Sequence, residues 1–299
     1  MSSDAAGASA RDLLGKNVIV TGGSGGIGRV TVGALARRGA RVWLAGRSPE
    51  AAARAMTALG AGAGSASGGA TLEIEFLPLD LGDLVSVRAA AANFLARDLP
   101  LHVLVNNAGR AGPGGITRDG FELTFAVNHL AHFLLTRLLE PALRAGAPAR
   151  VVNVSSESHR AVRGLDFASF RRPTSSATGL REYGASKLCN ILFTRELARR
   201  LRGSAVTTNC LHPGFVATRF GDESGGLISG VIGFAKLFAI SPAQGADTIV
   251  HLASAPEVAE TSGEYFYRRR PATPTAAARD DRAALALWQR SAALAGIEE

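Results

Sequence analysis

Two side chains of the sequence have the types and the spacing of an acid–base pair. Tyr183 and Lys187 are four residues apart, so on a helix they lie on one face, one turn from each other. A tyrosine hydroxyl ordinarily has a pKa of about 10, which is too high for a base at neutral pH. A nearby lysine cation favours the phenolate and lowers that pKa. The pair could then exchange a proton with a carbonyl or alcohol oxygen.

Two further polar side chains are candidates for the same chemistry. Ser156 follows the strand predicted over 150–154 and could hydrogen-bond the reacting oxygen, with Ser155 as the alternative. Asn128 stands inside a helix predicted over about 121–145, and could hold a water that connects the lysine to solvent. Because the asparagine side chain competes for backbone hydrogen bonds, it is a poor residue for a helix interior. We therefore expect a local kink there.

A glycine-rich turn near the N-terminus is the candidate nucleotide-binding element. The β-branched run Val18-Ile19-Val20 is typical of a buried parallel strand and leads into Thr21-Gly22-Gly23-Ser24-Gly25-Gly26-Ile27-Gly28. A helix is predicted to follow, up to about residue 38. Glycines let the backbone approach a phosphate, and the helix N-terminus supplies N–H groups. The spacing T-G-x-x-x-G-I-G differs from G-x-G-x-x-G, and a tight turn without a ligand is the alternative.

The residue that follows the second strand bears on the choice of dinucleotide. The strand predicted over 41–46 ends at Arg47, where NAD-binding βαβ units carry an acidic residue for the ribose 2′-hydroxyl. A planar guanidinium suits a 2′-phosphate instead. We therefore expect NADP(H), with NAD(H) less favoured; a surface arginine without a ligand is the alternative.

Polar residues also follow the third and fourth strands. Asp80-Leu81 comes at the end of the strand predicted over 72–79. Asp80 could accept a hydrogen bond from an adenine amino group, or cap the helix predicted over 84–97. Asn106-Asn107-Ala108-Gly109 follows the strand predicted over 103–105. Because it ends at the same edge of the sheet as the glycine turn, we favour a binding role over an ordinary turn.

The alternation of strands and helices predicts the architecture. We expect one α/β domain over 15–299, with a doubly wound, mostly parallel sheet flanked by helices. Residues 1–14 are expected to form a flexible leader. The remaining predicted elements are helices over 49–59, 183–202, 242–254 and 281–294, strands over 205–210 and 264–267, and a mobile loop over 60–70.

Composition excludes several classes of function. The chain has 299 residues, a hydrophobic content of 46% and a net charge of +8, but its arginines are scattered, so we expect no nucleic-acid partner. Two cysteines, Cys189 and Cys210, provide neither a disulfide framework nor a metal cluster, which favours a reducing compartment. We expect no metal site, no signal peptide and no membrane span, and hence a cytoplasmic protein.

Together these motifs resemble the short-chain dehydrogenase/reductase family over about residues 15–270. The resemblance implies a single-domain Rossmann fold with a sheet of about seven strands. The resemblance implies Tyr183 as general acid/base, Lys187 as the ligand of the nicotinamide ribose that lowers the tyrosine pKa, Ser156 orienting the substrate, and Asn128 in a proton relay. It implies that these residues bind the cofactor: Gly22, Ser24, Gly26, Ile27, Gly28, Arg47, Asp80, Leu81, Asn107, Ala108, Gly109, Tyr183, Lys187, Pro213, Gly214, Val216 and Thr218.

A narrower resemblance points to the retinol dehydrogenase and WW-domain oxidoreductase branch. It is carried by the runs Val127–Phe133, Val152–Ser156, Ser186–Phe193 and Leu211–Gly214. The resemblance implies NADP(H) and a lipophilic alcohol, ketone or aldehyde, although we expect neither the N-terminal membrane anchor nor the WW domain of that branch. The run Lys187–Asn190 is also similar to light-dependent protochlorophyllide reductases. The alternatives are a reductase of a specialised polyketide- or tetrapyrrole-like substrate and a non-catalytic dinucleotide-binding sensor or scaffold.

The segment over about 215–240 is a candidate substrate lid. It is too apolar for an idle loop, and its apolar residues are Leu227, Ile228, Val231, Ile232, Phe234, Leu237, Phe238 and Ile240. A dimer contact and a membrane-surface helix are the alternatives. The family resemblance also implies a possible homodimer or homotetramer built on the long helices.

Overall fold

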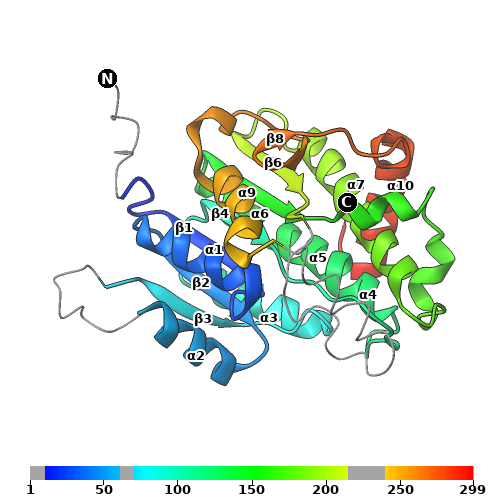
Figure 1. Ribbon diagram of the computed structural model, residues 1–299, viewed down its shortest axis with the longest axis horizontal. Helices are drawn as coiled ribbons and strands as arrows, with labels where there is room; N and C mark the ends of the chain where they lie inside the picture. Colours follow the sequence, from blue (N-terminus) through cyan, green and yellow to red (C-terminus); the bar gives the residue numbers. More distant parts are fainter. Residues whose placement is uncertain (1–10, 61–70, 215–239, 299) are drawn as a thin grey trace.

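One sheet organises the chain. The computed structural model describes residues 11–60, 71–214 and 240–298, and every structural statement below refers to these residues. Their strands form a single sheet in the order β3-β2-β1-β4-β5-β6-β7-β8 (Figure 1). All neighbouring pairs are parallel except β7 with β8, which is antiparallel. The predicted fold class is confirmed; the eighth strand, β8, is a two-residue edge that periodicity could not reveal.

The element bounds follow the predicted rhythm closely. The strands are β1 (Asn17–Thr21), β2 (Arg41–Gly46), β3 (Ile74–Pro78), β4 (Val103–Asn106), β5 (Ala149–Val154), β6 (Val206–Leu211), β7 (Tyr265–Tyr267) and β8 (Arg270–Pro271). The main helices are α1 (Gly26–Arg37), α2 (Pro49–Leu59), α3 (Leu84–Leu95), α7 (Leu180–Arg200), α9 (Pro242–Ser254) and α10 (Asp281–Ala295). Short helical turns are η2 (Glu157–Ala161), η3 (Phe167–Arg171), η4 (Pro256–Val258) and η5 (Ala277–Arg279).

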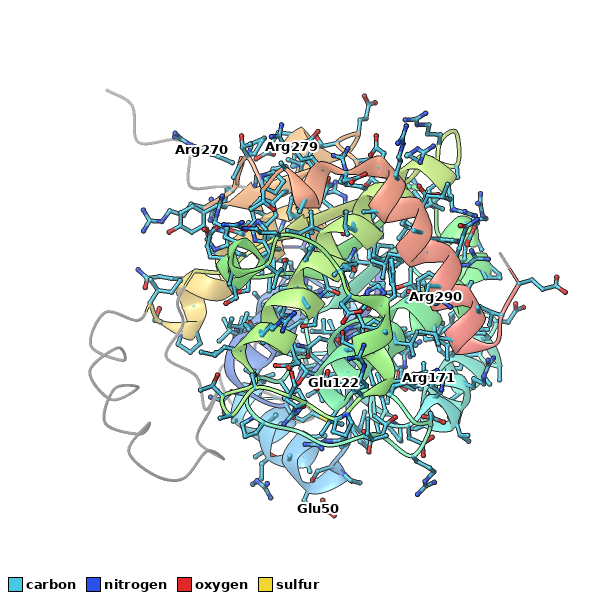
Figure 2. The ribbon with its side chains drawn as sticks, turned by 90° about the vertical axis from the view of Figure 1, so that its right-hand side faces the viewer. Glu50, Glu122, Arg171, Arg270, Arg279 and Arg290 are labelled. Carbon is cyan, nitrogen blue, oxygen red and sulfur yellow. The ribbon has the colours of Figure 1, made fainter. Side chains whose placement is uncertain are left out.

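Side-chain alternation along β1 separates two apolar layers. Val18 and Val20 belong to the cluster that α1, α2 and α9 cover, whereas Ile19 belongs to the cluster beneath α3 and α7. All three side chains are fully buried, as a central parallel strand requires. The last helix, α10, packs on α7 rather than on the sheet, with Arg290 on its exposed face (Figure 2).

The single helix predicted over 121–145 was wrong, because the chain is broken there into four pieces. These are α4 (Leu123–Phe125), a π-helical turn η1 (Ala126–Leu130), α5 (Ala131–Leu138) and α6 (Glu140–Ala145). The π-helical turn contains Asn128, so the predicted local kink is confirmed. The second break precedes Pro141, which has no N–H to continue the ladder of hydrogen bonds.

The predicted leader ends too late. Leu13 is buried, with 6% of its surface exposed, and its N–H donates to the Arg38 carbonyl at 2.9 Å. Asp12 forms an ion pair with the Arg38 side chain. Residues 11–14 therefore belong to the packed domain, because one leucine side chain and one carboxylate fasten this small polar segment to the end of α1.

No helix within 11–60, 71–214 or 240–298 is long and apolar enough to cross a membrane.

Candidate active site

The glycine turn between β1 and α1 folds tightly onto itself. Gly22 has a φ of +67°, and its N–H donates to the Ala45 carbonyl of β2 at 2.8 Å. A Cβ atom on Gly28 would stand 2.2 Å from the Gly22 carbonyl oxygen and 2.7 Å from the Asn107 amide nitrogen. Since no side chain fits in that space, this position requires glycine.

The start of α1 has the features of an anion site. Its N-cap residue, Gly25, offers no side-chain acceptor to the first-turn N–H groups, and the first turn holds no acidic residue. Those N–H groups and the positive end of the helix dipole therefore remain for a ligand anion. The turn fits the pyrophosphate of a dinucleotide, and Gly22, Ser24, Gly26, Ile27 and Gly28 all lie on it.

The loop after β4 is held against this turn by Thr21. The Thr21 hydroxyl oxygen accepts the N–H groups of Asn107 and Ala108, each at 3.0 Å, and the Asn107 side chain donates to the Thr21 carbonyl at 2.8 Å. Asn106 differs, because its buried amide donates to Asn153 at 2.8 Å inside the sheet. Of the two asparagines, Asn107 therefore belongs to the site and Asn106 to the core.

Arg47 follows β2 at the same edge. It is exposed, and within the described residues no acidic side chain pairs with it. A Cβ atom on the preceding Gly46 would stand 3.9 Å from the Ser24 hydroxyl oxygen. The structure thus brings Ser24 of the glycine turn beside the strand end that carries Arg47.

The structure rejects one alternative for Asp80. The cap of α3 is Asp83, whose carboxylate accepts the Val85 N–H at 2.8 Å, whereas the Asp80 carboxylate accepts the Gly82 N–H at 2.9 Å. Asp80 therefore shapes the turn ahead of the helix. Leu81 is 6% exposed and packs into the core, where its side chain supports that turn.

The catalytic candidates meet between β5 and α7. Lys187 is 2% exposed, and its ammonium group donates to the Val154 carbonyl at 3.0 Å. It lies 5.5 Å from the centre of the Tyr183 ring, while the Tyr183 hydroxyl is hydrogen-bonded to the Ser156 side chain. Tyr183, Lys187 and Ser156 are thus brought together as the sequence predicts.

Burial sets the protonation of the pair. It raises the pKa of Tyr183 to about 12, against a smaller lowering by the Ser156 hydrogen bond, and it lowers the pKa of Lys187 to about 8. The pKa of Tyr183 is therefore raised on balance, whereas the sequence predicts a lowering by Lys187. The physical reason is that burial removes the phenolate from water, which disfavours the charged form more than the Ser156 hydrogen bond favours it.

The two serines after β5 are clearly separated. Ser155 is buried, and its hydroxyl donates to the Lys187 carbonyl at 2.8 Å. Ser156 lies on the Tyr183 side. The geometry favours Ser156 as the serine that faces a reacting oxygen.

Asn128 is fixed by its own side chain. Its amide oxygen accepts the Arg110 N–H at 2.8 Å, and its amide nitrogen donates to the Arg110 carbonyl and to the Ser186 hydroxyl, each at 2.9 Å. A Cβ atom on Gly109 would stand 3.3 Å from the Asn128 amide oxygen and 3.4 Å from the Lys187 ammonium nitrogen. The relay candidate and the lysine therefore converge on the loop after β4.

Sequence reasoning missed a cluster beside Ser156. The Tyr265 hydroxyl donates to the Glu157 carboxylate at 3.1 Å, and the His212 ring nitrogen lies 3.2 Å from the same oxygen. The His212 ring also stacks on Tyr267 at 4.1 Å. Because Glu157 follows Ser156 and His212 precedes Pro213, this cluster links two strand ends of the site. Their neighbouring places in the sequence motifs were the available signal.

The end of β6 completes the described part of the site. Pro213 follows His212, and Gly214 has a φ of +92°, a conformation that favours glycine. Val216, Thr218 and all of the predicted lid except Ile240 lie outside the described residues.

Comparison with known proteins identifies the family. A family model described as short chain dehydrogenase matches residues 16–225. The chain belongs to the short-chain dehydrogenase family. Its members are oxidoreductases that bind a nicotinamide dinucleotide.

Curated relatives place the chain in the retinol dehydrogenase-like branch of this family. The chain is 42% identical to the WW domain-containing oxidoreductase of Danio rerio over 288 residues, which cover 94% of this chain and 68% of that protein. It is 42% identical to retinol dehydrogenase 11 of Homo sapiens, over 95% of this chain and 87% of that protein.

Solved structures agree with the short-chain dehydrogenase fold. An uncharacterized protein from Mycobacterium paratuberculosis has a TM-score of 0.75 and 30% identity, over 97% of this chain and 96% of that one. A metagenomic short-chain oxidoreductase in complex with NADP has a TM-score of 0.60 and 27% identity, over 84% of this chain and 95% of that one.

Proposed function

We propose that this short-chain dehydrogenase interconverts a lipophilic alcohol and its ketone or aldehyde with NADP(H), using Tyr183 as general acid/base. The observation that carries the proposal is the hydrogen bond between the Tyr183 hydroxyl and Ser156, beside the buried Lys187. A carbonyl oxygen placed between the two hydroxyl groups would receive a hydrogen bond from each. When bound, the nicotinamide exchanges a hydride with the carbonyl carbon.

The protonation of the pair favours carbonyl reduction. With a pKa of about 12, the Tyr183 phenol keeps its proton at neutral pH and is ready to give it to a carbonyl oxygen. The Lys187 cation, with a pKa of about 8, stabilises the phenolate that this step leaves. Alcohol oxidation runs the same transfer in reverse and needs the phenolate first.

Asn128 has a part in returning the proton. Its side chain is committed to the loop after β4, so a relay water would be held by its backbone carbonyl rather than by its amide. That water would connect Lys187 to solvent, and hence resupply Tyr183.

Arg47 supports the preference for NADP(H). An exposed guanidinium with no acidic partner in the described structure is available to a 2′-phosphate, and charge-assisted contacts of this kind are strong. The solved relative with bound NADP agrees with this choice.

The lipophilic substrate class is supported by two independent observations. Retinol dehydrogenases 11 and 13 of Homo sapiens are named for an apolar alcohol and are 42% and 40% identical to this chain. The sequence over 215–240 is apolar, which suits the wall of an apolar pocket.

Nucleotide titration followed by a substrate panel tests the proposal. We expect NADPH to bind more tightly than NADH, and NADPH absorbance to decay with at least one lipophilic aldehyde or ketone. Tight binding without decay across a broad panel that includes polyketide-like and tetrapyrrole-like carbonyls would favour the sensor or scaffold instead. Failure to bind either nucleotide would contradict both functions.

Two predictions concern the whole protein. A cytoplasmic location is supported by the two free, buried cysteines, and cell fractionation tests it. The homodimer or homotetramer stays a prediction that sedimentation can measure. Any such assembly must take account of α10, whose Trp288 is 2% exposed and packs on Phe193 of α7.

A further inference from the structure

Two buried histidines follow Asn128 in the chain, His129 on the π-helical turn η1 and His132 in the first turn of α5. His129 and His132 are 1% and 2% exposed. They point to opposite partners, since His129 contacts Ser291 of α10 and His132 contacts Thr21 at the end of β1. Neither histidine belongs to the acid–base pair or to the glycine turn, so their bonds need another account.

The hydrogen bonds of His132 determine where its proton lies. The Nδ1 atom is 3.2 Å from the Asn128 backbone carbonyl, which can only accept, so Nδ1 carries the proton and donates. The neutral ring then has an acceptor at Nε2. That atom lies 2.9 Å from the Thr21 hydroxyl oxygen.

The contacts of Thr21 agree with this tautomer. Its hydroxyl oxygen already accepts the N–H groups of Asn107 and Ala108, which leaves its one proton to donate. The shorter of its two acceptors is His132 Nε2 at 2.9 Å; the Val105 carbonyl lies at 3.3 Å. The Thr21 hydroxyl therefore donates to His132 Nε2, and His132 Nδ1 donates to the Asn128 carbonyl.

We infer that His132 is a positioning residue that couples the dinucleotide-binding turn to the backbone carbonyl of Asn128. One end of its ring orients the hydroxyl that holds the loop after β4, and the other end fixes the carbonyl assigned above to the relay water. The effect of the Asn128 bond on catalysis rests on the proposed function. The effect of the Thr21 bond on nucleotide binding is argued from Thr21 and the glycine turn alone.

Burial keeps this connector neutral. It lowers the pKa of His132 to about 4, and the nearby Lys187 cation acts in the same direction against the Asn128 bond. The ring therefore keeps one donor and one acceptor through the neutral pH range. A charged imidazolium would have two donors, and would lose the bond from Thr21.

Two conservative variants separate the two bonds. In His132→Asn, the shorter amide can reach the Asn128 carbonyl but not Thr21. In His132→Gln, the longer amide oxygen can accept from Thr21, while the donor toward Asn128 is lost. Ser291→Ala is the matched control, because it removes a buried histidine bond on the α10 side of η1, at 2.9 Å, without touching Thr21.

The experiment measures the NADPH dissociation constant, kcat and melting temperature of all three variants in the full chain. We expect about fivefold weaker NADPH binding for His132→Asn, and about fivefold lower kcat with nearly unchanged NADPH binding for His132→Gln, as one lost hydrogen bond predicts. Ser291→Ala should lower the melting temperature alone.

Two outcomes overturn the inference. The first is that all three variants lose melting temperature while NADPH binding and kcat stay at wild-type values. The second is that His132→Asn and His132→Gln show the same pattern of losses. A wild-type protein that binds NADPH but turns over no substrate contradicts the proposed function instead, and the binding contrast between the two His132 variants then decides the nucleotide half.

Discussion

The glycine turn and the acid–base cluster stand at the same edge of the sheet but are built in different ways. The turn consists of consecutive residues, and its backbone packs so closely on itself that no side chain fits at Gly28. The cluster gathers side chains from distant segments, and it buries a cation, Lys187, under the end of β5. The turn should therefore fail when volume is added. The cluster should lose catalytic activity when a charge or hydroxyl is removed. Removal of the buried charge should at the same time stabilise the folded protein.

Replacement of the buried cation gives the largest expected effect. Lys187→Met should lower kcat about a thousandfold, in the range of lost acid–base catalysis. The same change should raise the free energy of unfolding by about 1–3 kcal/mol at pH 7, because burial of the ammonium group opposes folding. The Val154 carbonyl keeps a donor, the Asn190 amide at 3.1 Å. Turnover and chemical denaturation measure the two effects.

The pH dependence provides the internal control for Lys187. Its pKa is about 8 in the folded protein, below the ordinary 10.5, so the unfolded chain binds more protons between these values. Below about pH 8 the buried ammonium group destabilises the folded wild-type protein by the full amount. As pH rises from 8 to 10.5, the free energy of unfolding of the wild-type protein should therefore approach that of Lys187→Met. A stability difference that is constant over this range would contradict burial as the cause.

Added volume in the glycine turn gives the next largest effect. Gly28→Ala should weaken NADPH binding about a hundredfold and lower the melting temperature, because the new Cβ would collide with the Gly22 carbonyl. Gly25→Ala is the matched control for stability without nucleotide, since a Cβ atom there meets nothing within 4 Å. Equal melting temperatures for the two variants would count against the tight approach at Gly28.

Loss of the guanidinium after β2 gives the smallest of the three effects. Arg47→Ala should weaken NADPH binding about tenfold, the scale of one charge-assisted contact, while NADH binding changes less than about twofold. Arg54→Ala, which removes another exposed arginine on α2, is the control for net charge. Equal losses for the two nucleotides would argue against recognition of a 2′-phosphate.

The same contrast explains what the sequence could predict. The strand 18–20, the glycine turn and the four-residue spacing of Tyr183 and Lys187 are local patterns, and the structure has all of them. The distortion of the helix at η1 is also a local feature, because Asn128 inside the predicted helix indicates a kink there.

Other features depend on packing between distant segments. The raised pKa of Tyr183 follows from the burial of its phenol by surrounding segments. In the Glu157–His212–Tyr265 cluster, Glu157 and Tyr265 are 108 positions apart in the sequence. Leu13 lies in a small, polar segment that the sequence assigns to the leader, and its hydrogen bond to the Arg38 carbonyl is evident only in the folded structure. No periodicity in the sequence carries this information.

Replacement of the Tyr183 hydroxyl tests the central claim most directly. Tyr183→Phe keeps the ring and removes only the group that is hydrogen-bonded to Ser156. With a carbonyl substrate from the panel, the account predicts that kcat falls about a thousandfold while the NADPH dissociation constant changes less than about twofold. A variant that keeps a tenth or more of wild-type turnover would contradict Tyr183 as the proton donor.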